Sequence, residues 1–390
     1  MNKKMYELGS NKSVIRELYE YGKQRAERFG EENVYDFSIG NPNIPAPESV
    51  NETIKRITDL PDSHLYTSAQ GDDKVRQKIS EYIASEYNGS IPKENIYMTT
   101  GAAAALSIVF KALTDEDRNE FIVFAPYFPE YKVFVESAGG VLKTQKTNDR
   151  FGIETDGLTD LITPKTAAII LNSPVNPTGN VFSAEELKPL FDLLDEYSKK
   201  GQDIYVIADE PYRELVYDEG VTVPYIPNMY DNAIVCYSWS KSLSLAGERI
   251  GYIAVSPKIK NDKELYLSIC GAGRALGYVC ASSLFQRVVA ECLGQTADLS
   301  VYKRNRDKLY NALISYGFVV NEPKGAFYLF LKSPVPNDEF LDKAKELGIL
   351  FVPSESFGIE GWVRIAYCVS PDVIDRSLPK FKELSEYFIK

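Results

Sequence analysis

Histidine is almost absent from this chain: its 390 residues include one, His64. Ser-His-Asp and Cys-His catalysis would both depend on that single side chain. His64 lies in a turn-like segment, residues 60–66, and we interpret it as structural or exposed to solvent. Proton transfer in an enzyme of this sequence therefore needs another side chain, and lysine is the obvious candidate.

Cysteine is scarce as well. The five cysteines are odd in number and contain no C-x-x-C pair: Cys236, Cys270, Cys280, Cys292 and Cys368. Together with a single histidine they offer no Cys/His constellation, so we predict no metal site. Scattered thiols in a chain of this length are typical of a reducing compartment, and we expect a cytoplasmic protein.

The sequence also lacks the features of membrane and nucleic-acid-binding proteins. No stretch approaches ~18 consecutive apolar residues, so we expect no membrane span. Residues 1–7 have no apolar run behind their lysines, so we expect no signal peptide. The formal net charge of -11 argues against a general nucleic-acid or acidic-membrane partner. A local basic pocket for a phosphate remains compatible with that charge.

The chain does contain a regular alternation of apolar runs and helical patterns. The runs that predict buried strands are residues 96–100, 121–125, 167–171, 204–208, 233–237 and 250–255. Continuous apolar runs separated by helices indicate an α/β fold with a mostly parallel sheet covered by helices on both faces. Ser183 and Glu186 form a capping-box pattern at the start of one helix, and Asp72 or Asp73 is expected to cap another.

The pattern changes in the last quarter of the chain. We predict an amphipathic helix over residues 12–29, a helix over 259–275, and one long helix from about 281 to 316. Strands at 317–320, 326–331 and 361–367 alternate with helices at 337–347 and 371–388. This organisation predicts an N-terminal arm with part of a small domain (1–41), a large domain (42–281) and a smaller α+β domain (282–390).

Polar and aromatic residues gather where the predicted strands end: Phe128, Asn176, Asp209, Tyr212, Ser238 and Lys241. Ligands of parallel α/β sheets bind at the carboxyl ends of the strands. Lys241, in a serine-rich segment, could by itself be either a surface lysine or an amine that forms an imine. Gly101 joins a strand to an alanine-rich helix start, which either bares backbone N–H groups to an anion or allows tight packing. Gly40 either makes a turn or admits a ligand close to the backbone.

Four motifs in this order carry a resemblance over nearly the whole chain: Asn176-Pro177-Thr178-Gly179, Asp209-Glu210-Pro211-Tyr212, Ser238-Trp239-Ser240-Lys241 with Gly247-Glu248-Arg249-Ile250-Gly251, and finally Arg364. The chain resembles the class I/II aminotransferases, which are pyridoxal-phosphate enzymes of fold type I with an aspartate-aminotransferase-like architecture. The resemblance implies transfer of an amino group between an L-amino acid and a 2-oxoacid by a ping-pong mechanism.

The resemblance also implies a role for each matching residue around the cofactor ring. Lys241 matches the family's Schiff-base lysine and would afterwards carry the proton at the substrate Cα. Asp209 would pair with the pyridine nitrogen and keep it protonated. Tyr212 and Asn176 would hydrogen-bond the phenolic oxygen of the ring, and Phe128 would stack on its face.

The phosphate would lie at the helix start formed by Gly101, Ala102 and Ala103, with Ser238 and Arg249 adding a hydroxyl and a bidentate charge. Positions 102 and 103 depart from many relatives because they carry no polar side chain, so only their backbone N–H groups could bind. Tyr66 resembles the tyrosine that reaches the phosphate of the neighbouring subunit, which implies a homodimer with shared sites.

Substrate recognition is implied at two arginines. Arg364 would bind the α-carboxylate as a planar fork, close to Asn176 and the backbone of Gly40. Arg274 falls where dicarboxylate-specific members place an arginine that reaches across the dimer, which would favour aspartate or glutamate; the alternative is an arginine with an ordinary surface partner. Two other functions use the same scaffold: a carbon–sulfur β-lyase or related eliminating enzyme, and a cofactor-binding regulatory module.

Overall fold

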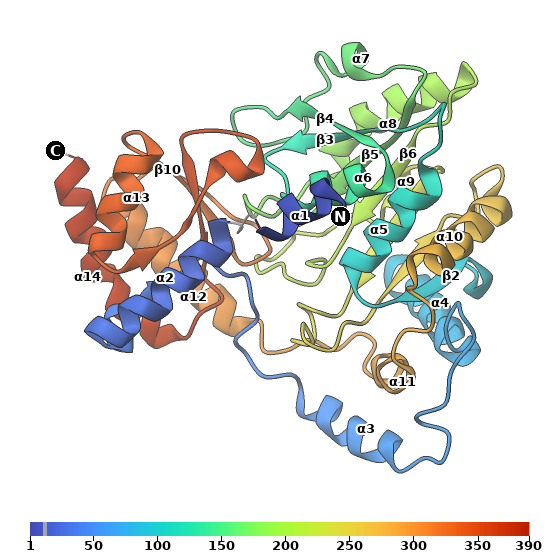
Figure 1. The fold of residues 1–390 in the computed structure, drawn as a ribbon, viewed down its shortest axis with the longest axis horizontal. Coiled ribbons are helices and arrows are strands. Elements are labelled where there is room, and N and C mark those ends of the chain that lie inside the picture. The colour runs from blue at the N-terminus through green and yellow to red at the C-terminus, as the bar shows by residue number, and fades with distance from the viewer. Residues whose placement is uncertain (11–13, 390) are drawn as a thin grey trace.

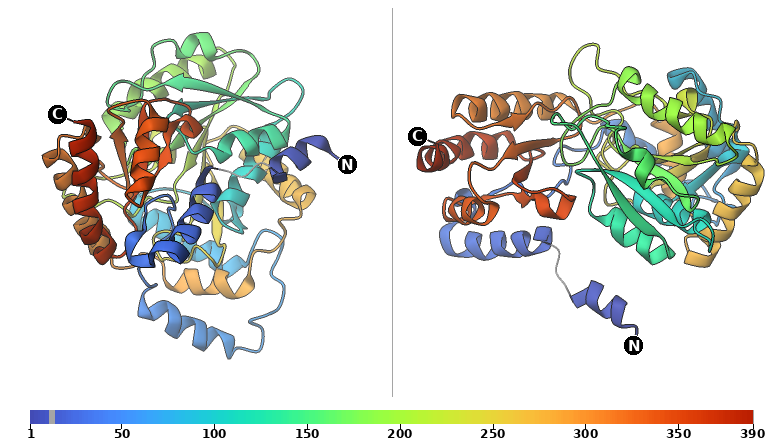
Figure 2. Two further views of the ribbon diagram at one scale, coloured as in Figure 1. Left: turned by 60° about the vertical axis from the view of Figure 1, so that its left-hand side comes forward. Right: turned by 90° about the horizontal axis from the view of Figure 1, so that it is seen from above.

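The computed structural model describes residues 1–10 and 14–389. A seven-stranded sheet with helices on both sides forms the larger part (Figure 1). The C-terminal elements lie beside it together with α2, and the right-hand view of Figure 2 shows the same separation. None of the helices in the described ranges has a hydrophobic stretch that could traverse a lipid bilayer.

The large sheet has the strand order β2 (Ile96–Thr99), β8 (Gly251–Val255), β7 (Ala233–Ser238), β6 (Tyr205–Asp209), β5 (Thr166–Asn172), β3 (Glu120–Ala125) and β4 (Val141–Lys146). The pairs from β7 through β4 are parallel, which confirms the mostly parallel sheet. β8 runs antiparallel to both of its neighbours. The loop before β8 contains no crossover helix, and a parallel return would need one.

Helices cover both faces of this sheet. One face carries α5 (Ala102–Leu113), α6 (Glu130–Ala138) and α10 (Asp262–Leu276), and the other carries α3 (Glu48–Thr58), α4 (Asp73–Tyr87), α8 (Ala184–Lys199) and α11 (Ser283–Glu291). Successive strand residues point to opposite faces, so Ile122 and Val206 join one core cluster while Val123 and Ile207 join the other. This double burial is the reason that the strands read as continuous apolar runs.

The smaller part contains two sheets. The first has the order β12 (Val352–Pro353), β13 (Trp362–Ala366), β10 (Tyr328–Lys332) and β9 (Val320–Asn321), and the second pairs β1 (Tyr35–Asp36) with β11 (Ile349–Leu350). The helices of this part are α2 (Val14–Phe29), α12 (Ser300–Ser315), α13 (Asn337–Glu346) and α14 (Pro371–Phe388). The strands expected at 326–331 and 361–367 and the helices expected at 337–347 and 371–388 are confirmed apart from their ends, and the strand expected at 317–320 is observed as β9 at 320–321. The domain limits at 41 and 281 stay a prediction.

Short elements complete the chain: α1 (Lys3–Ser10), α7 (Leu158–Leu161), α9 (Ile226–Met229) and the 3₁₀ helices η1 (Glu31–Asn33), η2 (Lys93–Asn95) and η3 (Ser354–Phe357). Both predicted helix starts are confirmed. The Asp72 carboxylate accepts the N–H groups of Lys74 and Val75, and Ser183 and Glu186 form the reciprocal capping box.

Two helix predictions need correction. The single helix expected from 281 to 316 is wrong, because α11 and α12 are separate helices. Gly294 adopts a φ of 77° between them, and the Asp298 carboxylate accepts the N–H of Ser300 at the start of α12. The helical hydrogen bonds of α11 thus end at Glu291, and a new set begins with α12 at Ser300. The helix expected over 12–29 begins at Val14, and residues 12 and 13 lie outside the described residues.

Candidate active site

A cavity of about 280 Å³ lies at the carboxyl ends of β5, β6 and β7, beside the start of α5 and below β10 and β13. Most residues predicted for the site line this cavity: Gly40, Ala102, Ala103, Phe128, Asn176, Asp209, Tyr212, Ser238, Lys241, Arg249 and Arg364. The structure therefore brings together side chains from both parts of the chain. Gly101 lies directly beside them, whereas Tyr66 and Arg274 lie elsewhere.

Lys241 follows β7, and its Nζ donates a hydrogen bond to the Gly40 carbonyl oxygen over 2.8 Å. Loss of solvent is the main cause that lowers the pKa of Lys241 to about 8; Cys368 acts in the opposite direction, and the charges of Arg249 and Arg364 contribute to the lowering. The amine can therefore lose and regain its proton close to neutral pH. That property is the one a nucleophilic and proton-carrying lysine needs.

Asp209 ends β6 with its two carboxylate oxygens in different situations. Oδ2 accepts a hydrogen bond of 2.6 Å from the Tyr131 hydroxyl. Oδ1 is buried and has no hydrogen-bond partner among the described residues. Burial raises the pKa of Asp209 to about 7, although the Tyr131 hydrogen bond acts in the opposite direction. A buried acceptor without a partner fits a cationic N–H donor in the cavity, as a protonated pyridine nitrogen would supply.

The start of α5 forms one end of the cavity. No side chain caps this helix, and its first residues, Ala102 and Ala103, line the cavity. Gly101 has a φ of 86°, and a Cβ there would lie 2.7 Å from Nη2 of Arg249. Glycine thus lets the guanidinium approach the free N–H groups of the helix. Buried Ser238 adds a hydroxyl, so the donor set fits a phosphate.

Arg364 lies on β13 and is buried. Its Nη1 donates to Asn176 Oδ1 over 3.0 Å, and its Nη2 donates to the Ser38 carbonyl oxygen over 2.7 Å. The Nε–H is buried and has no hydrogen-bond partner within residues 1–10 and 14–389, and the guanidinium lies 4.6 Å from the ring centroid of Tyr328. The arginine is therefore held in place while part of its donor fork stays free for a carboxylate.

Three residues of the site were missed from the sequence: Tyr131, Tyr328 and Asn172. The Tyr328 hydroxyl lies 2.9 Å from the Tyr212 hydroxyl, and a Cβ at Gly40 would lie 2.1 Å from it. Any side chain at position 40 would collide with Tyr328, so a glycine is needed there for the Tyr328 hydroxyl to lie against the backbone. Asn172 Nδ2 donates to the Asp209 carbonyl oxygen over 2.8 Å. The sequence held a signal for Tyr131, because it follows Phe128 by three residues at a helix start and so lies near it. For Tyr328 and Asn172 the only signal was a position near an end of a predicted strand.

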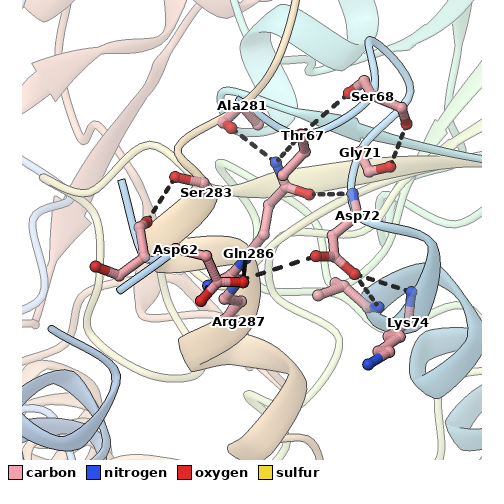
Figure 3. A network of polar contacts seen from close by, with 12 residues as sticks. Asp62, Thr67, Ser68, Gly71, Asp72, Lys74, Ala281, Ser283, Gln286 and Arg287 are labelled. Carbon is pink, nitrogen blue, oxygen red and sulfur yellow. Dashed lines mark hydrogen bonds and ion pairs between the residues drawn. The ribbon is translucent and has the colours of Figure 1, made fainter. Parts of the chain in front are cut away.

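Tyr66 and Arg274 are exposed and lie outside the cavity of their own chain. Tyr66 is 94% exposed, yet its loop is firmly held (Figure 3). Buried Gln286 donates to Thr67 Oγ1 over 3.2 Å and accepts the N–H of Asp72 over 2.7 Å. A fixed loop with an exposed aromatic ring is compatible with contact between Tyr66 and a second copy of the chain. That role of both residues stays a prediction.

The sheet, the covering helices and the cavity at the strand ends define an α/β enzyme of fold type I. Residues 32–381 match the family model for aminotransferase class I and II. The chain belongs to this family and is an enzyme of the aminotransferase type. The family and fold class predicted from the motifs are thus confirmed.

Three relatives illustrate the similarity. The probable aspartate aminotransferase of Methanocaldococcus jannaschii is 30% identical over 386 residues, covering 96% of this chain and 97% of that one. The aspartate aminotransferase of Sulfurisphaera tokodaii is 32% identical over 372 residues, with coverages of 90% and 89%. A crystal structure of an amino transferase from Eubacterium rectale has a TM-score of 0.97 and 50% identity, and covers 100% of this chain and 99% of that one.

Proposed function

We propose that this aminotransferase uses pyridoxal 5'-phosphate to move an amino group between an L-amino acid and a 2-oxoacid in two half-reactions. The observation that carries the proposal is the joint placement, in one cavity, of Lys241, the unpaired oxygen of Asp209 and the anion-binding start of α5. Class I and II aminotransferases as a family depend on this cofactor. When bound, pyridoxal phosphate supplies a ring that accepts electrons from the substrate Cα.

The residues that would hold the cofactor divide by the group they contact. Lys241 would form a bond with the carbonyl carbon of the cofactor. Asp209 Oδ1 would accept a hydrogen bond from the ring nitrogen, and Phe128 would cover the ring face. Ser238, Arg249 and the N–H groups at the start of α5 would bind the phosphate. Tyr212 and the Asn176 amide would donate to the phenolic oxygen. Asn176 can do so because Arg364 uses its Oδ1 and leaves Nδ2 free.

The chain's own residues then perform the steps at the substrate. Arg364 binds the α-carboxylate with the N–H donors that do not contact Asn176 and Ser38. Holding the carboxylate fixes the orientation of the bonds at the substrate Cα relative to the cofactor ring. Lys241 Nζ takes the proton from the substrate Cα, would pass it to the former carbonyl carbon of the cofactor, and would reverse this transfer in the second half-reaction. Its pKa of about 8 permits both directions near neutral pH.

A homodimer and an acidic substrate are the finer parts of the proposal. The Cys280 Sγ lies 3.5 Å from the Thr67 carbonyl oxygen, so two segments with exposed apolar residues adjoin: Leu65 and Tyr66 with Tyr278 and Val279. Such a patch favours burial against a second copy. Arg274 would then bind the distal carboxylate of aspartate or glutamate in the neighbouring site, and the names of two relatives support this substrate class.

The test is a comparison of wild-type protein with Lys241→Ala, using exposed Lys260→Ala as the matched control. Wild-type and control proteins should show a cofactor absorption band that changes on adding an amino acid and is restored by 2-oxoglutarate. Lys241→Ala should show neither the band nor turnover. Release of ammonia and pyruvate from cysteine-type substrates, without transfer to 2-oxoglutarate, would support the lyase instead. Full activity of Lys241→Ala would contradict the assignment.

A further inference from the structure

Tyr131 lies in the first turn of α6 and is completely buried in the core between that helix and the sheet. It stands 78 residues from Asp209 in sequence, yet its hydroxyl donates to Asp209 Oδ2 over 2.6 Å. Burial and the adjacent carboxylate raise the pKa of Tyr131 far above its ordinary value. The phenol therefore stays protonated and acts only as a donor towards Asp209.

This hydrogen bond determines which carboxylate oxygen of Asp209 is available to a ligand in the cavity. A carboxylate with one oxygen tied to a rigid donor has its plane and rotation set. Oδ2 is the oxygen held by Tyr131, and Oδ1 is buried with no hydrogen-bond partner in the part of the chain that the structure describes. The backbone of Asp209 is fixed as well, since its carbonyl oxygen accepts from Asn172. Tyr131 thus selects which oxygen the ring nitrogen would meet.

The same side chain also supports the residue predicted to cover the ring face. The rings of Tyr131 and Phe128 pack edge to face, with centroids 5.5 Å apart and planes at 86°. The backbone N–H of Tyr131 donates to the Phe128 carbonyl oxygen over 3.1 Å. One buried tyrosine therefore contacts both the group expected at the ring nitrogen and the group expected at the ring face.

We propose that Tyr131 is a positioning residue that couples Asp209 to Phe128 and aims Asp209 Oδ1 at the cofactor ring nitrogen. The proposal rests on the proposed function, because it needs the cofactor ring in the cavity. The groups that face Asp209 support it. Burial favours the protonated carboxyl, as does Glu210, the residue that follows β6, and the Tyr131 hydrogen bond opposes them. Cys236 on β7 and Tyr212 also face Asp209.

Tyr131→Phe is the informative variant because it removes one oxygen and keeps the ring against Phe128. We expect pyridoxal phosphate to bind about tenfold more weakly, since hydrogen bonds to charged groups contribute more than neutral ones. The acid limb of the pH dependence of cofactor affinity should move upward by roughly one pH unit, as the carboxyl loses a donor to its charged form. The measurement is a titration of cofactor-free protein with pyridoxal phosphate, followed by absorbance from pH 5 to 9.

Two further variants separate positioning from a general structural effect. Tyr230 is also buried, and its hydroxyl donates to the Ile204 carbonyl oxygen, so Tyr230→Phe is the matched control and should bind as wild type does. In an Asp209→Asn background, Tyr131→Phe should no longer shift the pH profile, because the titrating carboxyl is gone. An unchanged affinity and profile in Tyr131→Phe would overturn the proposal, and so would an equal shift in the Asp209→Asn background. Wild-type protein that binds no pyridoxal phosphate would instead refute the proposed function.

Discussion

Asp209→Asn should make the cofactor-free protein more stable at alkaline pH while it removes catalytic power. Burial raises the pKa of Asp209 from 3.8 to about 7. The folded protein thus holds this proton more tightly than the unfolded chain does. The stability that the proton contributes is fully present below about pH 4 and is lost as the pH rises through 7. At about 1.4 kcal/mol for each pKa unit, ionising Asp209 in the folded protein costs about 4 kcal/mol.

The assay is urea denaturation of cofactor-free wild type and Asp209→Asn between pH 4 and pH 8.5. Asparagine keeps the shape and still accepts the Tyr131 hydrogen bond, but it has no proton to lose. The variant should therefore gain up to about 4 kcal/mol relative to wild type across this range. Saturating pyridoxal phosphate should reduce the difference in unfolding free energy between the two proteins. The cationic ring nitrogen stabilises the wild-type carboxylate more than it stabilises the asparagine.

Exposed Asp149→Asn is the control for removing one negative charge from an acidic protein, and its stability should differ little from that of wild type. A difference between wild type and Asp209→Asn that stays constant from pH 4 to pH 8.5 would refute the reasoning. It would mean that Asp209 is already ionised in the cofactor-free cavity. A carboxylate held at such a cost is a local loss of stability retained for function.

Two predictions concern residues outside the cavity. Gln286→Leu removes two hydrogen bonds that hold the Tyr66 loop, those with Thr67 and Asp72, and should weaken pyridoxal phosphate binding about tenfold, with kcat unchanged at saturating cofactor. Unaltered affinity would contradict a role for the loop in the neighbouring site. Arg274→Ala should lower kcat/KM for aspartate and glutamate more than for alanine in steady-state assays. The difference should correspond to ~2–5 kcal/mol of binding free energy, because a buried distal carboxylate would lose its partner. An equal loss for alanine would contradict the acidic-substrate proposal.

Much of the site could be predicted because strand ends are visible in the sequence. Asp209, Ser238 and Lys241 each follow an apolar run, and parallel strands bring their carboxyl ends to one edge of the sheet. The sequence pattern could not show Tyr328, which is 116 residues from Tyr212 and contacts it through the packing of two separate sheets. Nor could helical periodicity alone reveal the break between α11 and α12, because it depends on one left-handed glycine.

The amino-acid sequence by itself determined the family, the strand-and-helix order and the residue types at the edge of the sheet. Those follow from local hydrophobic pattern and from motifs of adjacent residues. Only the tertiary structure decided the state of these residues: an amine with a pKa of about 8 at Lys241, a carboxyl with a pKa of about 7 at Asp209, and one carboxylate oxygen left without a partner. Desolvation and hydrogen bonding depend on which distant side chains surround a group, and packing alone sets that surrounding.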